Sequence, residues 1–200
     1  MKQRFILALA FVLLAATLFS FDGKRKGFIL GFGIGISSLS YKQTLEGGGE
    51  SITSPTVDET PFVTDFKIGY APDNKLEIYY SSKVAWFSMT NIYDANVNIA
   101  DGIGTFSASY FLSSKLKTTQ WAPSPFVSAG FGFSAWSTPN VDNSTSWTGT
   151  GFFVGGGYEF AKHFRAELNF FMNNPSHTES GITGTTNSSA LMLTINALAF

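Results

Sequence analysis

A strict two-residue alternation of side chains limits how this chain can fold more than any other feature of its sequence. From Phe28 to Ile36 every second residue is large and apolar. The positions between them hold Gly31, Gly33 and Gly35. Successive side chains of a β-strand point to opposite faces, whereas a helix repeats every 3.6 residues. This segment is therefore expected to be a strand with one apolar face and one face of small residues.

The same alternation recurs along the rest of the chain and predicts an all-β protein. The expected strands cover residues 28–37, 62–70, 76–86, 103–112, 125–136, 151–160, 164–170 and 188–200. The last of these is apolar on both faces, because Leu191, Leu193 and Ile195 compete with Met192 and Leu198. The sequence therefore does not decide which face of this last strand points outward.

The amino terminus has the layout of a secretory signal peptide. A short cationic start precedes an apolar run from Phe5 to Phe19. An apolar core of roughly 15 residues is typical of a cleaved signal, whereas a membrane-spanning helix needs about 20 apolar residues. We expect residues 1–20 to be removed and residues 21–200 to form a single domain that starts near Phe21. An uncleaved membrane anchor is the alternative.

Composition excludes several classes of protein. The chain has no cysteine, so it has neither disulfides nor a lipid-attachment cysteine. Loss of Lys2 and Arg4 with the signal leaves eleven basic residues against fourteen acidic ones, a net charge of −3, and nucleic-acid binding is not expected. The two histidines show no metal-ligand spacing, and no cofactor is expected. No apolar run after the signal reaches the length of a membrane helix, so any membrane span must be made of strands.

The expected connections between strands alternate in length. Long polar segments cover residues 42–60, 88–101, 137–148 and 173–187. Short connections lie near Asp73, near Leu116 and at Lys162. This alternation is typical of membrane barrels, which have short periplasmic turns at one rim and long extracellular loops at the other.

Charged residues and aromatic residues occupy different positions in the pattern. The side chains expected to project into the barrel lumen, where opposite charges can pair, are Asp65, Lys67, Glu77, Lys83, Glu159, Arg165 and Glu167. The rings expected at the two membrane interfaces are Tyr41, Tyr70, Trp86, Trp136, Tyr158, Phe160 and Phe164. Aromatic girdles outside and paired charges inside favour a membrane barrel over a soluble lipid-carrier barrel, which has an apolar interior.

Hydrocarbon offers no hydrogen-bond partner to a free strand edge, so a sheet that spans a membrane must close on itself. An even number of strands returns both termini to one side of the membrane. We therefore predict an eight-stranded antiparallel transmembrane β-barrel. A secreted soluble barrel with an inward apolar face remains the alternative.

Several of these segments resemble the outer-membrane β-barrel family, which includes the OmpA-like transmembrane domain, OmpX-like proteins and opacity-type proteins. The resemblance is carried by the signal segment, the glycine-alternating strand 27–37, the hairpin 156–169 and the terminal Phe200. It implies a location in the bacterial outer membrane and contact with outer-membrane lipid. It also implies that the barrel-assembly machinery recognises the carboxy-terminal strand through Phe200.

The expected function is a structural or surface-interaction role through the extracellular loops. Within them, the segment from Glu46 to Glu50 is expected to be a plain flexible loop, with contact to a partner as the alternative. One alternative is a narrow, porin-like passive channel, because many residues expected in the lumen are small. A further alternative is a lipid-modifying enzyme or a protease. For that role the segment from His177 to Ser180 holds the residue types of a base, an acid and a nucleophile. Catalysis is not expected, because neighbouring loop residues seldom face one another correctly.

Overall fold

The computed structural model describes residues 25–90, 96–113, 122–139 and 146–199. The expected signal segment 1–20, the expected start of the mature chain near Phe21 and the terminal Phe200 lie outside the described residues. No helix among the described residues is long and apolar enough to cross a membrane.

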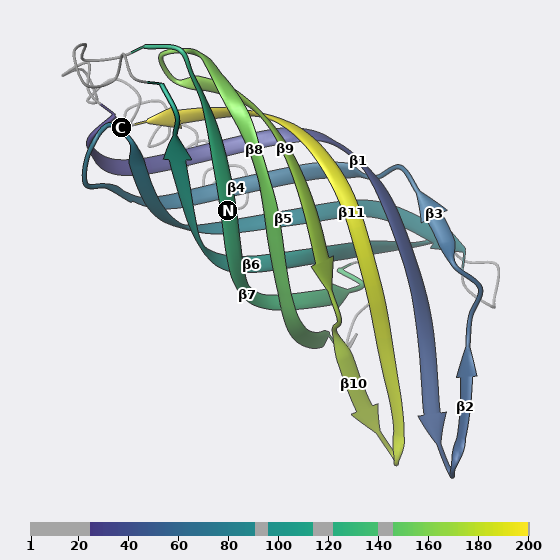
Figure 1. Cartoon of the computed structure of the whole chain (residues 1–200). Helices are drawn as coiled ribbons and strands as arrows, with labels where there is room; N and C mark the ends of the chain where they lie inside the picture. Colours follow the sequence, from purple (N-terminus) through teal and green to yellow (C-terminus); the bar gives the residue numbers. More distant parts are fainter. Residues whose placement is uncertain (1–24, 91–95, 114–121, 140–145, 200) are drawn as a thin grey trace, which may run out of the picture.

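Eight long antiparallel strands form a closed ring (Figure 1). They are β1 (Gly27–Gly47), β4 (Phe62–Ala71), β5 (Leu76–Thr90), β6 (Asn96–Phe111), β7 (Ser124–Ser137), β8 (Trp147–Ala161), β9 (Phe164–Asn173) and β11 (Ile182–Ala199). Each strand pairs with the next in this order, and β11 pairs with β1. The prediction of an eight-stranded antiparallel barrel is confirmed.

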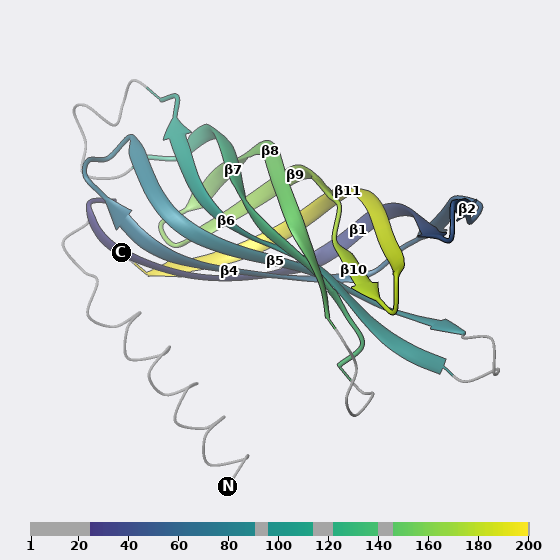
Figure 2. The same cartoon turned by 90° about the horizontal axis from the view of Figure 1, so that it is seen from below.

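The seam that closes the ring is long. The pairing of β1 with β11 runs from Leu30 opposite Ala199 to Glu46 opposite Thr183. Closure gives the backbone N–H and C=O groups of both strands a partner, so neither strand is left as an open edge. The short connections at Asp73 and Lys162 lie at one end of the barrel, and the strand ends that flank the long connections lie at the other (Figures 1 and 2). The short connection expected near Leu116 lies outside the described residues.

Two of the expected long loops are largely strand. β1 and β11 extend beyond the barrel and are flanked there by β2 (Glu50–Thr53) and β10 (Ser176–Glu179), while β3 (Val57–Glu59) pairs with β1 (Figure 1). No strands were expected within these two segments, so the bounds expected for these connections are wrong.

Tight turns explain why these segments fold back as hairpins. Gly48 and Gly49 have φ values of 61° and 87°, and Gly181 has a φ of 80°. Residues with positive φ form the two-residue turns whose twist matches paired strands. The flanking sequences are rich in threonine, which favours strands. We call β10, β11 up to residue 187, β1 from residue 42 and β2 the arm.

Two strand boundaries also differ from the sequence-based expectation. β6 begins at Asn96 rather than near Ile103, because Asp101 and Gly102 pair within the ladder to Ala85 and Val84. β11 begins at Ile182 instead of near residue 188. The residues added to β6 include the apolar Val97 and Ile99, and the ladder with β5 continues through them without a register shift.

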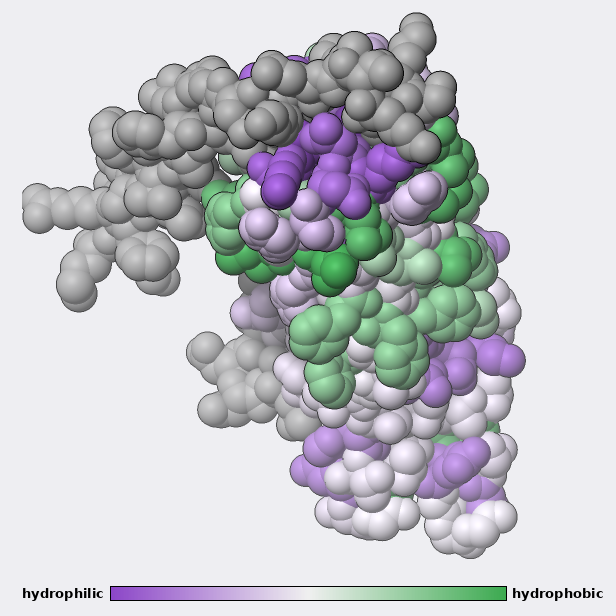
Figure 3. All heavy atoms as spheres, turned by 60° about the vertical axis from the view of Figure 1, so that its left-hand side comes forward, coloured by the Kyte–Doolittle hydropathy of each residue, from purple (hydrophilic) through white to green (hydrophobic). Residues whose placement is uncertain are grey.

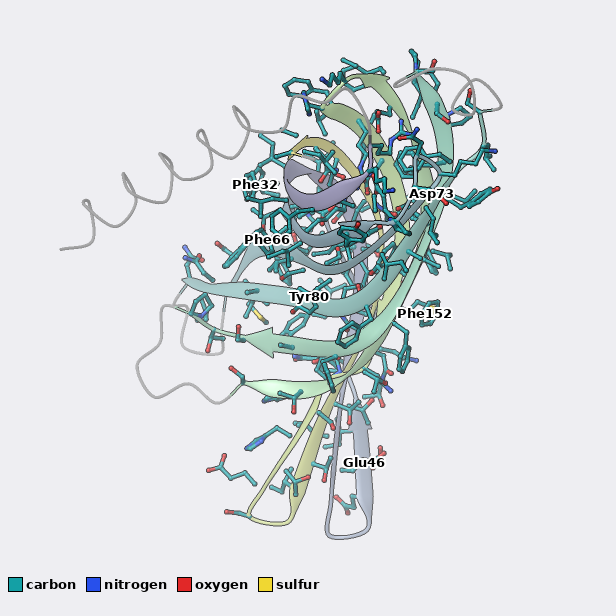
Figure 4. The ribbon with its side chains drawn as sticks, turned by 90° about the vertical axis from the view of Figure 1, so that its left-hand side faces the viewer. Phe32, Glu46, Phe66, Asp73, Tyr80 and Phe152 are labelled. Carbon is teal, nitrogen blue, oxygen red and sulfur yellow. The ribbon has the colours of Figure 1, made fainter. Side chains whose placement is uncertain are left out.

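The barrel has its apolar side chains outside and its charged side chains inside. Figure 3 shows a belt of apolar residues between two hydrophilic zones. In Figure 4, Phe32 and Phe66 project from one side of the barrel and Phe152 from the other, while Glu46 lies on the arm below the barrel. On β11 the open question of facing is settled: Leu191, Leu193 and Ile195 point outward, and Met192 and Leu198 are buried.

Gly35 allows β1 and β11 to approach closely at the seam. A Cβ atom placed on Gly35 would lie 1.9 Å from the carbonyl oxygen of Leu193, a backbone atom that cannot move without parting the strands. We expect Gly35→Ala to lower the free energy of unfolding by about 1–3 kcal/mol, the usual cost of overpacking. Urea unfolding in lipid vesicles measures this loss.

A matched control lies on the same strand. At Gly31 an added Cβ would lie 3.3 Å from Cγ of Leu198, a side-chain atom that can shift. Gly31→Ala is therefore expected to cost less than Gly35→Ala. Equal losses for the two variants would contradict a close approach at Gly35.

Candidate functional site

A cluster of six charged side chains fills the middle of the barrel. All six are fully buried and come from β4, β5 and β9: Asp65, Lys67, Glu77, Lys83, Arg165 and Glu167. They sit at alternate positions of their strands, so the same alternation that turns apolar residues outward turns these charges inward. Three acids and three bases make the cluster neutral as a whole.

Lys67 lies at the centre of this cluster. Its Nζ donates to Oδ2 of Asp65 at 2.7 Å, to Oε1 of Glu167 at 2.6 Å and to Oδ1 of Asn196 at 3.1 Å. A lysine has three N–H donors, and here each has an acceptor. Burial of this ammonium is therefore compensated by two carboxylates and an amide.

The other two bases link the remaining acids. Nζ of Lys83 lies 2.7 Å from Oδ2 of Asp65 and 3.8 Å from Oε2 of Glu167. Arg165 lies 2.7 Å from Glu77 through Nη1 and 2.6 Å from Glu167 through Nε. Glu167 thus touches all three bases. Its loss would remove a neighbouring negative charge from all three bases at once.

A second ion pair lies nearer the short turns. Arg25 precedes β1, and its side chain enters the barrel to meet Glu159 with distances of 3.0 Å and 2.6 Å from Nε and Nη2. Its guanidinium also lies 3.7 Å from the ring centroid of Phe111 and donates to the carbonyl of Asn74 at 2.6 Å. Arg25 lies before the alternating segment, so the two-residue repeat does not predict that it enters the lumen.

Apolar side chains fill the barrel on the arm side of the charged cluster. The buried members of this apolar layer are Leu39, Tyr41, Val63, Ala85, Ile99, Ile103, Trp136, Phe153, Phe171, Ala190 and Met192. Asp101 lies on the same side and accepts from Nδ2 of Asn173 at 2.8 Å and from Oγ of Ser188 at 2.7 Å. Charged and apolar layers together occupy the cross-section of the barrel.

This filling predicts the electrical behaviour of the protein. Eight-stranded barrels have an interior just wide enough to be filled by side chains, and Lys67, Phe153 and Phe171 are here fully buried within it. We expect the purified, folded chain to give no discrete current steps in planar lipid bilayers, with a large porin as positive control. Reproducible steps would contradict a filled lumen.

The structure places all seven charged residues expected in the lumen inside the barrel, Glu159 included. The aromatic rings divide into two groups. Those that point outward are Tyr70, Trp86, Tyr158, Phe160 and Phe164. Tyr41 and Trp136 are instead buried inside, where their ring centroids lie 5.0 Å apart and each also packs on Phe87.

The expectation that Tyr41 and Trp136 face lipid is therefore corrected. Both residues have the lumenal phase of their strands: Tyr41 follows Ser37 and Leu39, and Trp136 follows Ser134 at two-residue intervals. They close the arm side of the barrel with aromatic packing. The two-residue repeat of the sequence therefore already assigns Tyr41 and Trp136 to the lumenal face.

The residues considered for catalysis lie apart from the barrel interior. His177 and Glu179 lie on β10 and Ser180 in the turn after it, and no hydrogen bond joins these three described residues. His163 lies in the turn between β8 and β9, at the opposite end of the barrel, and burial lowers the pKa of its imidazole. Within the described part of the chain, no group of three His, Cys, Asp or Glu could hold a metal ion.

The arrangement as a whole defines a class of protein. A closed β-ring with an apolar outer belt, outward aromatic rings and an ionic interior is an integral membrane β-barrel of the outer-membrane type. Water-soluble barrels have the opposite distribution, with the apolar face inward. The soluble alternative is thereby excluded on the placement of the side chains.

No protein-family model and no curated protein matches the chain. Several solved structures match the chain. Neisserial surface protein A (NspA) matches at 14% identity over 84% of this chain and 97% of that one, with a TM-score of 0.44. The outer membrane protein OprG from Pseudomonas aeruginosa matches at 11% identity over 88% and 98%, with a TM-score of 0.49. The outer membrane protease OmpT from Escherichia coli matches at 5% identity over 86% and 96%, with a TM-score of 0.39. A surface protein and a protease share this likeness, so it does not tell what the chain does.

Proposed function

We propose that this chain is an integral protein of the bacterial outer membrane whose barrel anchors a protruding arm that contacts partners at the cell surface. One observation carries the proposal: the barrel interior is filled by buried side chains, while β1 and β11 continue beyond the barrel as a regular sheet. A filled barrel with an extended arm is suited to holding and presenting a surface.

The proposal includes the route to the membrane and the orientation within it. Residues 1–20 act as the export signal, and Phe200 marks the carboxy-terminal strand for the barrel-assembly machinery. The outward apolar side chains contact outer-membrane lipid. The connections at Asp73 and Lys162 face the periplasm and the arm faces outward, because membrane barrels have their short turns on the periplasmic side.

The arm has two features of an interaction surface. Its strand order is β10-β11-β1-β2, so β2 and most of β10 form edges whose backbone groups can pair with an added strand. Apolar side chains are also exposed on it: Leu45 lies opposite Ile52, and Ile182 lies beside Gly47. Exposed apolar residues at a sheet edge favour a partner that adds an extended segment.

The charge of this region limits what that partner can be. The described residues 42–59 and 173–187 hold one lysine, Lys42, against five carboxylates. These acids are Glu46, Glu50, Asp58, Glu59 and Glu179. Like charges repel across an interface, so a polyanion is disfavoured and a neutral or cationic partner with apolar side chains is favoured.

Adhesion of whole cells to beads of defined chemistry tests this role. A Gram-negative host that displays the chain is mixed with octyl-coated, amine-coated and carboxylate-coated microspheres. We expect binding to octyl and amine beads above that of host cells without the chain, and no added binding to carboxylate beads. The variant Leu45→Ser/Ile52→Ser/Ile182→Ser should lose the added binding. Equal binding by variant and wild type, at equal surface amounts, would overturn the role of the arm.

The channel and the enzyme remain the other candidates. Buried side chains in every layer of the lumen weigh against a channel. The described residues His177, Glu179 and Ser180 share no hydrogen bond, which weighs against a catalytic triad, whose members must lie within hydrogen-bond reach. Unchanged proteolytic and lipid-modifying activity of outer-membrane fractions after His177→Ala would agree with this ranking.

A further inference from the structure

A cavity opens on the outer wall at the base of the arm. Its volume is about 470 Å³, and it lies over β8, β9, β11 and β1. Residues that point away from the lumen line much of it, including Phe152, Met172 and Ser189. In the outer membrane such a hollow would be filled by lipid rather than water.

The lining changes from apolar to polar along the barrel axis. One row across the sheet holds Phe152, then Met172 opposite it, then Ser189 and Ser40. Phe131 extends the apolar end of this row, since it pairs with Phe152. At this level the wall still has large apolar side chains on β7, β8 and β9.

The next row towards the arm is polar throughout the cavity. It contains Thr150, Asn174, Asn187 and Lys42. Oγ1 of Thr150 donates to Oδ1 of Asn174 at 3.1 Å, and Asn187 pairs with Lys42. The boundary between the apolar belt and the aqueous side therefore passes through the cavity. In a membrane barrel this boundary marks the level of the lipid headgroups.

Charge adds a preference for one kind of headgroup. Lys42 is the one ionic side chain among the residues that line the cavity. Asp58 lies opposite Ser40, and its carboxylate accepts a hydrogen bond from Oγ of Ser40 at 2.5 Å. A cation above an apolar floor matches an amphiphile whose phosphate lies at the polar row and whose chain runs down the wall.

We propose that this cavity binds one phosphate-bearing lipid of the outer leaflet, with its acyl chain against Phe152 and Met172 and its phosphate beside Lys42. The amides of Asn174 and Asn187 can donate to the phosphate or to the glycerol oxygens. The proposal rests on the proposed location in the outer membrane. It adds that the lipid is held at a defined place on the wall, next to the base of the arm.

Paramagnetic broadening of amide resonances tests the site. The mature chain is refolded into phosphatidylcholine nanodiscs that contain a minor fraction of phosphatidylglycerol with a nitroxide on its headgroup. We expect several-fold stronger broadening of the amides of Met172 and Ser189 than of those around Trp86, on the far wall at the arm-side rim. With headgroup-labelled phosphatidylcholine in its place, the contrast should be weaker, because that headgroup carries a compensating cation.

Variants decide between recognition and chance contact. Lys42→Gln should remove the excess broadening at Met172 and Ser189, whereas Lys26→Gln, an exposed cation at the other end of the barrel, should leave it unchanged. Even broadening around the barrel, or no effect of Lys42→Gln, would overturn the lipid site while leaving the membrane location intact. A chain that fails to insert into the nanodiscs would instead overturn the proposed function.

Discussion

Replacement of Glu167 by glutamine is expected to lower the free energy of unfolding by about 3–5 kcal/mol, the usual cost of removing one partner from a buried ionic group. Glu167 lies 2.6 Å from Lys67, 2.6 Å from Arg165 and 3.8 Å from Lys83. Glutamine has nearly the same size, so the change removes charge without opening a cavity. Three buried bases would then face two acids, with no water to screen the excess.

Urea unfolding of the chain in lipid vesicles, followed by tryptophan fluorescence, measures this loss. Glu179→Gln, on the exposed β10 hairpin, is the matched control and should change stability by less than about 0.5 kcal/mol, as is usual for surface positions. The double variant Glu167→Gln/Lys67→Met restores a neutral cluster and should recover part of the loss. A change in Glu167→Gln no larger than that in Glu179→Gln would contradict a buried ionic core.

Arginine on the lipid-facing wall is expected to have the second large effect. Leu193 points outward from β11 between Ile36 and Leu168, near the middle of the apolar belt. An arginine at the bilayer midplane of a membrane barrel costs about 2–4 kcal/mol. Leu193→Arg should therefore lower the free energy of unfolding by this amount.

The arm provides an unusually close control for this substitution. Leu45 is 50% exposed and Leu193 is 49% exposed, but Leu45 lies on the arm. Leu193→Arg and Leu45→Arg make the same change at equally exposed positions, so the two variants differ only in what surrounds the new side chain. Leu45→Arg should cost less than about 0.5 kcal/mol. Similar losses at both positions, measured by the same unfolding experiment, would show that Leu193 does not contact hydrocarbon.

Much of the barrel follows from the alternation in the sequence. Lys67 and Glu167, for example, each stand between two outward apolar neighbours, and this phase placed the charges in the lumen. Which acid meets which base could not be predicted. Lys67 and Glu167 are 100 residues apart and meet across the lumen, so their contact depends on the stagger of the closed ring.

The errors at Tyr41 and Trp136 have a common cause. Both were assigned by their closeness to long polar segments, whereas their position within the two-residue repeat put them on the lumenal face. Inside a filled barrel, an aromatic ring near a strand end can pack over the lumen as well as at the membrane interface. The position of an aromatic residue within the two-residue repeat thus predicts whether its ring lies in the lumen or at the membrane interface better than its distance from a loop does.

The two-residue alternation could not predict the arm or the position of Arg25, for different reasons. Polar hairpins such as β10–β11 have no apolar face, so alternation gives no signal and only their threonines and turn glycines favour strands. Arg25 enters the lumen from outside the ladder, just before Gly27 with its φ of 125°. A single basic residue ahead of a strand has no periodicity by which to be recognised.

Gel mobility of the chain recovered from the outer membrane of an expressing host tests the central claim most directly, because a closed membrane barrel resists the detergent until it is heated. Boiled and unboiled samples are compared on the same gel. The account predicts that the chain is found in the outer-membrane fraction and that its unboiled form migrates at a different position from the boiled form. A chain that is recovered in the soluble fraction and migrates identically with and without boiling would contradict a closed barrel that spans the membrane.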